Sequence, residues 1–225
     1  KLDVNELLRS RDIHSIDLVI LTHAHADHIG GYLDLIQHME IKKTLVNQAT
    51  AKILINQCPE LKDRLTILDK NQSINYQINA SEFSLYIQSV MGKNANSDEN
   101  ENTLVCYMKS QKVIGVFLAD MSREMMDDQM RFFQRYLQNQ TFNFIKVSHH
   151  GSKTGFSKDF YNQYKSAKMI ISCSNKFHMP NKDFIRQLTE NNSNYYLTYN
   201  RGEIDLTICK DKIKIKSFLE EANGF

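Results

Sequence analysis

The sequence predicts a layered α/β fold, folded as a single domain over residues 1–225. Short apolar, strand-like segments alternate with amphipathic, helix-like segments along nearly the whole chain, and the chain ends in strands. The composition is 41% hydrophobic and 24% charged, with only eight Gly and two Pro, which excludes a disordered or fibrous chain. A chain of this length can bury a substantial core.

The first segments predict a helix, a strand and a second helix. Asp3 and Glu6 have the spacing of a capping box ahead of a short helix, and residues 16–21 form a near-continuous apolar run, as expected of a buried strand. The second helix is expected from about Asp27, with three apolar residues on one face: Ile29, Leu33 and Ile36. His38 falls off this apolar face.

Strands and helices continue to alternate after residue 82. Residues 83–88 alternate between apolar and polar side chains, which predicts a half-buried strand that ends or bulges at Ser89 and Val90. A polar loop is expected over residues 92–102. The remaining expected strands are 103–108, 113–118, 143–148, 169–173, 195–198, 204–209 and 212–218, with helices beginning near Ser122, Ser157 and Asn181.

Charge and cysteine placement narrow the class of protein. Lys and Arg outnumber Asp and Glu by 28 to 26, so no large basic excess of the whole chain argues for nucleic acid, although a local basic patch is compatible with these counts. The four cysteines are far apart and form no CxxC pair, which favours reduced core thiols over disulfides. No apolar run approaches the roughly 20 residues that span a bilayer. Because the chain begins at Lys1 inside an expected helix, we expect a segment upstream of it.

Residues 22–31, with the sequence THAHADHIGG, carry the clearest chemical signal. They place His23, His25, Asp27 and His28 where an expected buried strand gives way to a helix. Imidazole nitrogens and carboxylate oxygens both bind zinc-like ions at about 2.0–2.2 Å, so donors converging on a rigid strand end suit a metal site. A chance cluster of solvent-facing histidines is the alternative. The eight histidines of the chain are too concentrated here and at residues 149–150 to favour it.

This HxHxDH motif and its preceding apolar strand resemble the metallo-β-lactamase superfamily. Two later segments extend the resemblance: Asp120 within Leu-Ala-Asp-Met-Ser, and His149 within Val-Ser-His-His-Gly-Ser-Lys-Thr. The form of these segments is similar to the hydrolase domain of the competence DNA-uptake protein ComEC and its free-standing relatives. The resemblance covers nearly the whole chain. It implies an αββα four-layer sandwich, from which the usual first strand pair is missing in this sequence.

The resemblance also implies roles for particular residues. The implied metal ligands are His23, His25, Asp27, His28, Asp120 and His149, with Asp120 bridging two divalent ions, zinc or manganese. Asp27, Asp120 and His150 are the implied catalytic residues. Asn102, Ser152, Lys153 and His178 are the implied substrate contacts. Because His38 is the only histidine between His28 and His149, the first metal site lacks a usual third histidine and is expected to bind weakly or stay empty.

Alternatives remain open for several of these residues. His149 is placed ahead of His150 as the ligand because it is the first residue beyond the expected strand, and His150 has a structural hydrogen bond as its alternative role. Asp120 closes an apolar run, where an unpaired carboxylate is costly, but it could instead help cap the helix from Ser122. A structural role for His178 is equally compatible with its position.

The expected activity is metal-dependent hydrolysis, with a nucleic-acid phosphodiester as the leading substrate. Four basic residues at the expected edge of the site support this, although they also suit a solvated rim: Arg123, Lys146, Lys153 and Lys158. Hydrolysis of a small ester, such as a phosphocholine ester, lactone or thioester, is the first alternative. A binding or effector module without catalysis is the second. Reduced cysteines favour a cytoplasmic location. If the chain is part of a ComEC-type channel protein, the resemblance implies an extracytoplasmic location instead. An upstream segment or a partner chain is expected to complete the fold.

Overall fold

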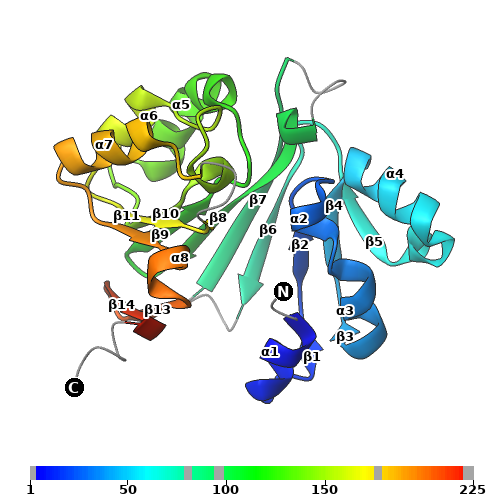
Figure 1. Cartoon of the computed structure of the whole chain (residues 1–225). Helices are drawn as coiled ribbons and strands as arrows, with labels where there is room; N and C mark the ends of the chain where they lie inside the picture. The colour runs from blue at the N-terminus through cyan, green and yellow to red at the C-terminus, as the bar shows by residue number, and fades with distance from the viewer. Residues whose placement is uncertain (1–3, 79–82, 94–98, 175–178, 220–225) are drawn as a thin grey trace. The chain divides into compact units, whose positions relative to one another are not determined.

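The computed structural model describes residues 4–78, 83–93, 99–174 and 179–219. Asp3 of the expected capping box and His178 lie outside the described residues. The chain forms two compact units (Figure 1). Unit 1 comprises Lys1–Ser73 and Gln88–Leu104, and unit 2 comprises Ile74–Ile87 and Val105–Phe225.

Unit 1 contains short parallel strands with helices between them (Figure 1). Its strands are β1 (Ser15–Ile16), β2 (Val19–Leu21), β3 (Glu40–Ile41), β4 (Thr44–Asn47) and β5 (Leu65–Leu68). Its helices are α1 (Val4–Ser10), α2 (Ala26–Ile29), α3 (Tyr32–His38), α4 (Gln48–Gln57) and the 3₁₀ turn η1 (Pro59–Asp63). β2, β4 and β5 form one parallel sheet, and β1 pairs with β3. Parallel strands joined by helices are the arrangement that the alternating pattern predicted.

Apolar side chains from β2, β4 and the helices form the core of unit 1. This cluster comprises Leu21, Ile29, Tyr32, Val46, Ala51, Leu54 and Leu61. Asn47 begins α4 by accepting a hydrogen bond from Thr50 N through its side chain (2.8 Å). The core therefore fixes β2 against β4, and β2 leads directly into the HxHxDH segment.

A seven-stranded mixed sheet, most of whose residues belong to unit 2, has the order β12-β11-β10-β9-β8-β7-β6. The strands are β6 (Ser73–Ile78), β7 (Phe83–Met91), β8 (Asn102–Ser110), β9 (Val113–Phe117), β10 (Phe144–Lys146), β11 (Lys168–Ile171) and β12 (Tyr195–Leu197). β9 to β12 are parallel to one another, and β8 is antiparallel to β9. The carboxyl ends of β9 and β10 therefore lie at the same edge of this sheet.

The helices of unit 2 are α5 (Arg123–Leu137), α6 (Lys158–Gln163), α7 (Lys182–Glu190) and α8 (Thr198–Arg201), and this unit also contains the 3₁₀ turn η3 (Ser148–Gly151). A further 3₁₀ turn, η2 (Glu99–Glu101), belongs to unit 1. A terminal hairpin pairs β13 (Ile204–Cys209) with β14 (Lys212–Ser217). The three longest of these helices begin at the expected caps, since Ser122, Ser157 and Asn181 each accept a backbone N–H.

One glycine is dictated by packing between two neighbouring strands. Gly115 of β9 lies opposite Phe144 of β10, and a Cβ atom built on Gly115 would overlap the Phe144 ring. Phe144 is buried in a cluster with Met108 and Val113. Only glycine leaves space for the ring at this point of the sheet.

Several sequence-based expectations differ from the structure. The run 16–21 is not one strand, because β1 and β2 pair in different sheets and are interrupted at residues 17–18. The helix expected from Asp27 is broken between Ile29 and Tyr32 into α2 and α3. β7 does not end at Ser89 and Val90 but continues to Met91. The alternation does break there, as expected, because these two adjacent residues are both buried.

The four cysteines carry no disulfide, as expected, but only Cys106 is a core thiol. Burial raises the pKa of Cys106 to about 12. Cys58 and Cys173 are half-buried, and Cys209 is exposed because it occupies an outward position of β13. Among the helices of the described residues, none is long and apolar enough to cross a membrane.

Candidate metal centre

Four potential ligands gather in unit 1 at the carboxyl end of β2. His23 is fully buried, His25 and His28 are half-buried, and Asp27 is exposed. His25 is the N-cap residue of α2, so the helix begins between His25 and His28 and turns the chain back over the strand end. A Cβ on Gly30 would overlap the Ala26 carbonyl oxygen, which explains the first glycine after the motif. Gly31 has open space around its Cα, so close packing does not explain the second.

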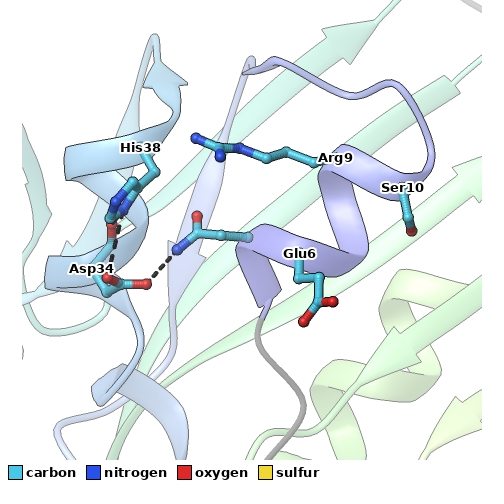
Figure 2. Close-up of a pocket in the computed structure, with 6 residues that line it drawn as sticks. Glu6, Arg9, Ser10, Asp34 and His38 are labelled. Carbon is cyan, nitrogen blue, oxygen red and sulfur yellow. Dashed lines mark hydrogen bonds and ion pairs between the residues drawn. The ribbon is translucent and has the colours of Figure 1, made fainter.

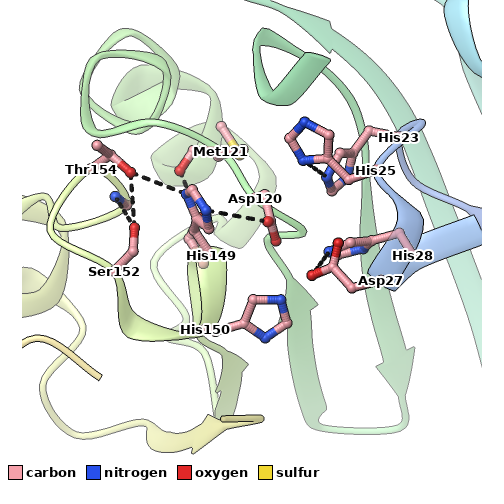
Figure 3. Close-up of polar contacts among 12 residues, drawn as sticks. His23, His25, Asp27, His28, Asp120, Met121, His149, His150, Ser152 and Thr154 are labelled. Atoms are coloured by element: carbon pink, nitrogen blue, oxygen red, sulfur yellow. Dashed lines mark hydrogen bonds and ion pairs between the residues drawn. The ribbon is translucent and has the colours of Figure 1, made fainter. Parts of the chain in front are cut away.

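Two imidazole rings of unit 1 contact each other (Figure 3), and two rings contact one hydroxyl. His23 Nε2 lies 3.2 Å from His25 Nδ1. Thr22 Oγ1 lies 3.1 Å from His23 Nδ1 and 3.2 Å from His28 Nδ1. A hydroxyl has one proton, so it donates to one of these rings and accepts from the other or from a third group. Thr22 therefore sets the orientation of two rings, a role that its place directly before His23 could have indicated.

The strand end that carries these rings is held by hydrogen bonds from outside β2. The Thr22 carbonyl oxygen accepts from Leu104 N (2.9 Å) and from Asn47 Nδ2 (3.1 Å). Asn47 Nδ2 also donates to the Asn102 carbonyl oxygen (2.6 Å). Asn102, an expected substrate contact, is buried at the start of β8, and this bond uses its main chain.

Unit 2 carries a second group of potential ligands, at the carboxyl ends of β9 and β10. Asp120 is 2% exposed and follows Ala119, whose φ of 50° lies in the left-handed region. His149 N donates to the Ala119 carbonyl oxygen (2.9 Å), and Ser148 Oγ donates to the Met121 carbonyl oxygen (2.6 Å). These bonds join the loop after β10 to the loop after β9, so Asp120 and His149 lie together.

The histidine pair of unit 2 has an unusual backbone. His149 has φ 47° and His150 has φ 54°, and Gly151 follows with φ 79°. Non-glycine residues seldom adopt positive φ, and consecutive examples at a strand end are typical of functional sites, where the surroundings over-determine the conformation. This conformation turns the two adjacent rings apart, at an interplanar angle of 70°.

Each ring of the pair is oriented through its Nδ1 atom, and Figure 3 shows the contact of His149 with Thr154. His150 Nδ1 donates to the Ser172 carbonyl oxygen (2.6 Å), so Nε2 of the neutral ring carries the lone pair. His149 Nδ1 lies 3.1 Å from Thr154 Oγ1, and His149 Nε2 lies 3.7 Å from Asp120 Oδ2. Metal-binding histidines are commonly held through their second nitrogen in this way. Thr154 and the Ser172 carbonyl were not expected from the sequence.

Lys146 is the basic residue that lies deepest beside Asp120. It is the last residue of β10, and its Nζ donates to the Val147 carbonyl oxygen (3.1 Å). Burial lowers the pKa of Lys146, and the negative charge of Asp120 partly offsets that effect. Lys146 is a half-buried cation within unit 2, whereas Arg123, Lys153 and Lys158 are exposed.

Ser152 and His38 occupy positions that bear on their expected roles. Ser152 is buried, and its hydroxyl contacts Thr154 Oγ1 (2.8 Å) and accepts from Gly155 N (3.2 Å), so it supports the loop around His149. His38 is exposed, as expected from its place off the apolar face of α3. It lines a polar cavity of about 600 Å³ beside α1, where Asn5 donates to Asp34 (Figure 2).

Comparison with known proteins adds a family and several relatives. A family model described as "Beta-lactamase superfamily domain" matches residues 4–130, more than half of the chain. The chain is 26% identical over 204 residues to ComE operon protein 3 of Bacillus subtilis (strain 168). This match covers 88% of the chain and 25% of that protein, so the chain spans about a quarter of the relative's length.

Two solved structures share the fold at low identity. Unliganded yeast PDE1 matches with a TM-score of 0.51 and 14% identity, over 81% of this chain and 66% of that one. A putative metal-dependent hydrolase from Parabacteroides distasonis matches with a TM-score of 0.51 and 9% identity, over 83% of this chain and 78% of that one. At these identities the likeness concerns the fold alone. The expected α/β class and the expected similarity to the ComEC-like branch are confirmed.

Proposed function

Because the chain belongs to the family of beta-lactamase superfamily domains, we propose that it is a metal-dependent phosphodiesterase that cleaves nucleic acid. The superfamily consists of metal-binding hydrolases, which sets the reaction class at hydrolysis. The observation that carries the proposal is the set of histidine and aspartate donors at the strand ends of each unit. The resemblance to the DNA-uptake branch supports a nucleic-acid substrate.

The donor atoms of both units suit divalent metal ions. Unit 1 offers three imidazoles and the Asp27 carboxylate, and unit 2 offers the Asp120 carboxylate with two more imidazoles. Such mixed nitrogen and oxygen sets suit zinc or manganese. When bound, such ions lower the pKa of a coordinated water and stabilise the charge that develops on the phosphate.

The residues of unit 2 have distinct proposed tasks beside this chemistry. Asp120 and His149 would bind metal, with Thr154 holding the His149 ring in place. His150 presents Nε2 with its lone pair, because Ser172 fixes the proton on Nδ1, and Nε2 can therefore accept a proton or a metal bond. Lys146 supplies a positive charge that suits an anionic phosphodiester better than a neutral ester or lactone.

The remaining expected residues keep proposed roles at the substrate. Lys153 is exposed on the loop after the histidine pair, where it can reach a phosphate in solution. Asn102 is buried at the start of β8, which suits a positioning role through its main chain.

Cleavage assays with an Asp120→Asn variant test the proposal. The parent protein, loaded with zinc or manganese, is incubated with single-stranded DNA, duplex DNA and RNA. Asp128→Asn is the matched control, because Asp128 is an exposed carboxylate of α5 and its replacement changes the net charge equally. We expect the parent and the control to cut nucleic acid and Asp120→Asn to lose cleavage by several orders of magnitude.

Two other results would redirect the proposal. Metal binding without cleavage of any nucleic acid would remove the nuclease activity and make phosphocholine esters, lactones and thioesters the substrates to test. Loss of both metal binding and hydrolysis in the parent protein would instead indicate a binding module.

A further inference from the structure

We propose that the outward face of the β13–β14 hairpin binds the phosphate backbone of a single-stranded nucleic acid, an inference that rests on the proposed function and specifies how its substrate is held. This face is called the lysine face, and its cations are Lys212, Lys214 and Lys216. Nothing in the site at the ends of β9 and β10 uses these residues.

The hairpin separates apolar from charged side chains by strict alternation. Leu206, Ile208 and Ile213 pack against the buried cluster of Met108, Val113 and Phe144. Every second residue of β14 points the other way and is exposed, which leaves the three lysines in one row. Across from them in β13 lie Cys209, Thr207 and Asp205, so the face carries one acidic residue against three lysines.

Two charges of this row are poorly compensated within the part of the chain that the structure describes. Lys212 and Lys214 form no ion pair with another described residue, whereas the exposed Lys210 of the connecting turn is balanced by the exposed Asp211 next to it. Lysines that serve only to balance neighbouring carboxylates would be paired with them. Two uncompensated lysines on one face instead attract an anion with repeated charges.

The spacing of the row matches a polynucleotide. Alternate residues of a strand lie about 6.7 Å apart, which is close to the roughly 6–7 Å that separates neighbouring phosphorus atoms of one nucleic-acid strand, although the strand rises only about 3.4 Å per nucleotide along its axis. Successive lysines of the row can therefore contact successive phosphates. Lysines on an edge strand can also serve to prevent pairing with another chain, but that role gives no affinity for oligonucleotides.

An exposed aromatic residue beside the row favours single strands over duplex. Phe218 directly follows β14 and is 68% exposed. A Cβ on Gly202, at the end of α8, would contact Phe218, so the phenyl ring lies by that helix end. Unpaired bases stack on exposed rings next to a basic track, whereas paired bases cannot.

The position of the hairpin in unit 2 sets a minimum length for a substrate that contacts both the lysine face and the metal ligands of this unit. It packs against Val113 and Phe144, the first residues of β9 and β10, whereas Asp120 and His149 follow the other ends of these strands. Five residues of β9 span about 17 Å, which corresponds to about five nucleotides of a stacked strand and to roughly half that number of a fully extended one. A mononucleotide substrate therefore cannot reach both places.

Binding is measured with Asp120→Asn protein, without metal, so that cleavage does not interfere. A labelled oligothymidylate is titrated by fluorescence anisotropy at several salt concentrations. For Lys212→Gln/Lys214→Gln we expect the slope of log Kd against log salt to become shallower by about 1.4, since two phosphate contacts are lost. Phe218→Ala should weaken binding by about tenfold, without changing the slope. The matched control is Lys62→Gln/Lys70→Gln, two exposed lysines of unit 1, which should leave the slope unchanged.

Equal losses in both double variants, or none in either, would overturn the inference, as would binding to anionic lipid vesicles in place of oligothymidylate. Cleavage assays distinguish failure of DNA binding at the lysine face from failure of the proposed nuclease activity. In a protein with Asp120 intact, the double lysine variant should raise KM for long strands and leave hydrolysis of bis(p-nitrophenyl) phosphate unchanged. If that small diester and long strands all resist the parent while the lysine face still binds DNA, the proposed function fails and the inference stands.

Discussion

Replacing Thr154 by valine tests whether the loop after β10 orients His149 for metal binding. Thr154 Oγ1 is the group that contacts His149 Nδ1 (3.1 Å), and it also contacts Ser152 Oγ (2.8 Å). Valine has nearly the shape of threonine and removes only the hydroxyl. Loss of a group that holds a ligating histidine costs about 10–100-fold in metal affinity, or roughly 1.4–2.8 kcal/mol.

Folding stability should change far less than metal affinity. Thr154 is exposed, so valine leaves little buried polar surface unsatisfied, and exposed substitutions change stability by about 0.5 kcal/mol or less. The Thr154 carbonyl still accepts from Arg123 N (2.8 Å) and keeps the two loops joined. Calorimetric titration of zinc or manganese and urea unfolding of the metal-free protein measure the two quantities separately.

Thr154→Ser is the matched control, because serine keeps the hydroxyl and loses only the methyl group. It should bind metal nearly as well as the parent. Equal metal affinities for the serine and valine variants would refute a role for the hydroxyl. A valine variant that loses stability and affinity together would show that Thr154 supports the loop and not the ring.

Three further predictions concern unit 2. Gly115→Ala should lower the free energy of unfolding by about 1–3 kcal/mol in urea, because the new methyl group meets the buried Phe144 ring, and adding Phe144→Leu should recover part of the loss. Asn181→Ala should cost about 1 kcal/mol by leaving the first turn of α7 without its cap, and an unchanged urea midpoint would contradict this. Burial raises the pKa of Tyr136 and Tyr164 to about 12 from an ordinary value of 10.0, so the unfolded chain loses these protons first. The free energy of unfolding should therefore fall as the pH rises from 10.0 to about 12. The fall should be smaller in Tyr164→Phe, and urea midpoints measured across this pH range test this.

Short-range patterns in the sequence predicted much of the fold. The period of apolar residues located most strands of the seven-stranded sheet but assigned no element between residues 39 and 82, where β4, α4 and β5 lie. The caps at Ser122, Ser157 and Asn181 marked where three helices begin. Sequence-based expectations failed where packing against a neighbouring strand or sheet decided the structure. Ser89 interrupts the alternation of β7, yet the strand continues because neighbouring strands hold it in the sheet. Cys209 lies in an apolar run but is exposed, because the hairpin buries the opposite face.

For the candidate site, too, the sequence predicts some features and the tertiary structure decides others. The sequence by itself determined which ligands are available and that each group follows a strand, since HxHxDH, Asp120 and the histidine pair are contiguous with apolar runs. Only the tertiary structure decided how the unit 2 rings are held. Thr154 and the Ser172 carbonyl orient adjacent histidines through different loops, and Lys146 is half-buried near Asp120. Ring orientation and desolvation depend on atoms brought together from distant segments, and residue type and spacing along one chain do not specify those neighbours.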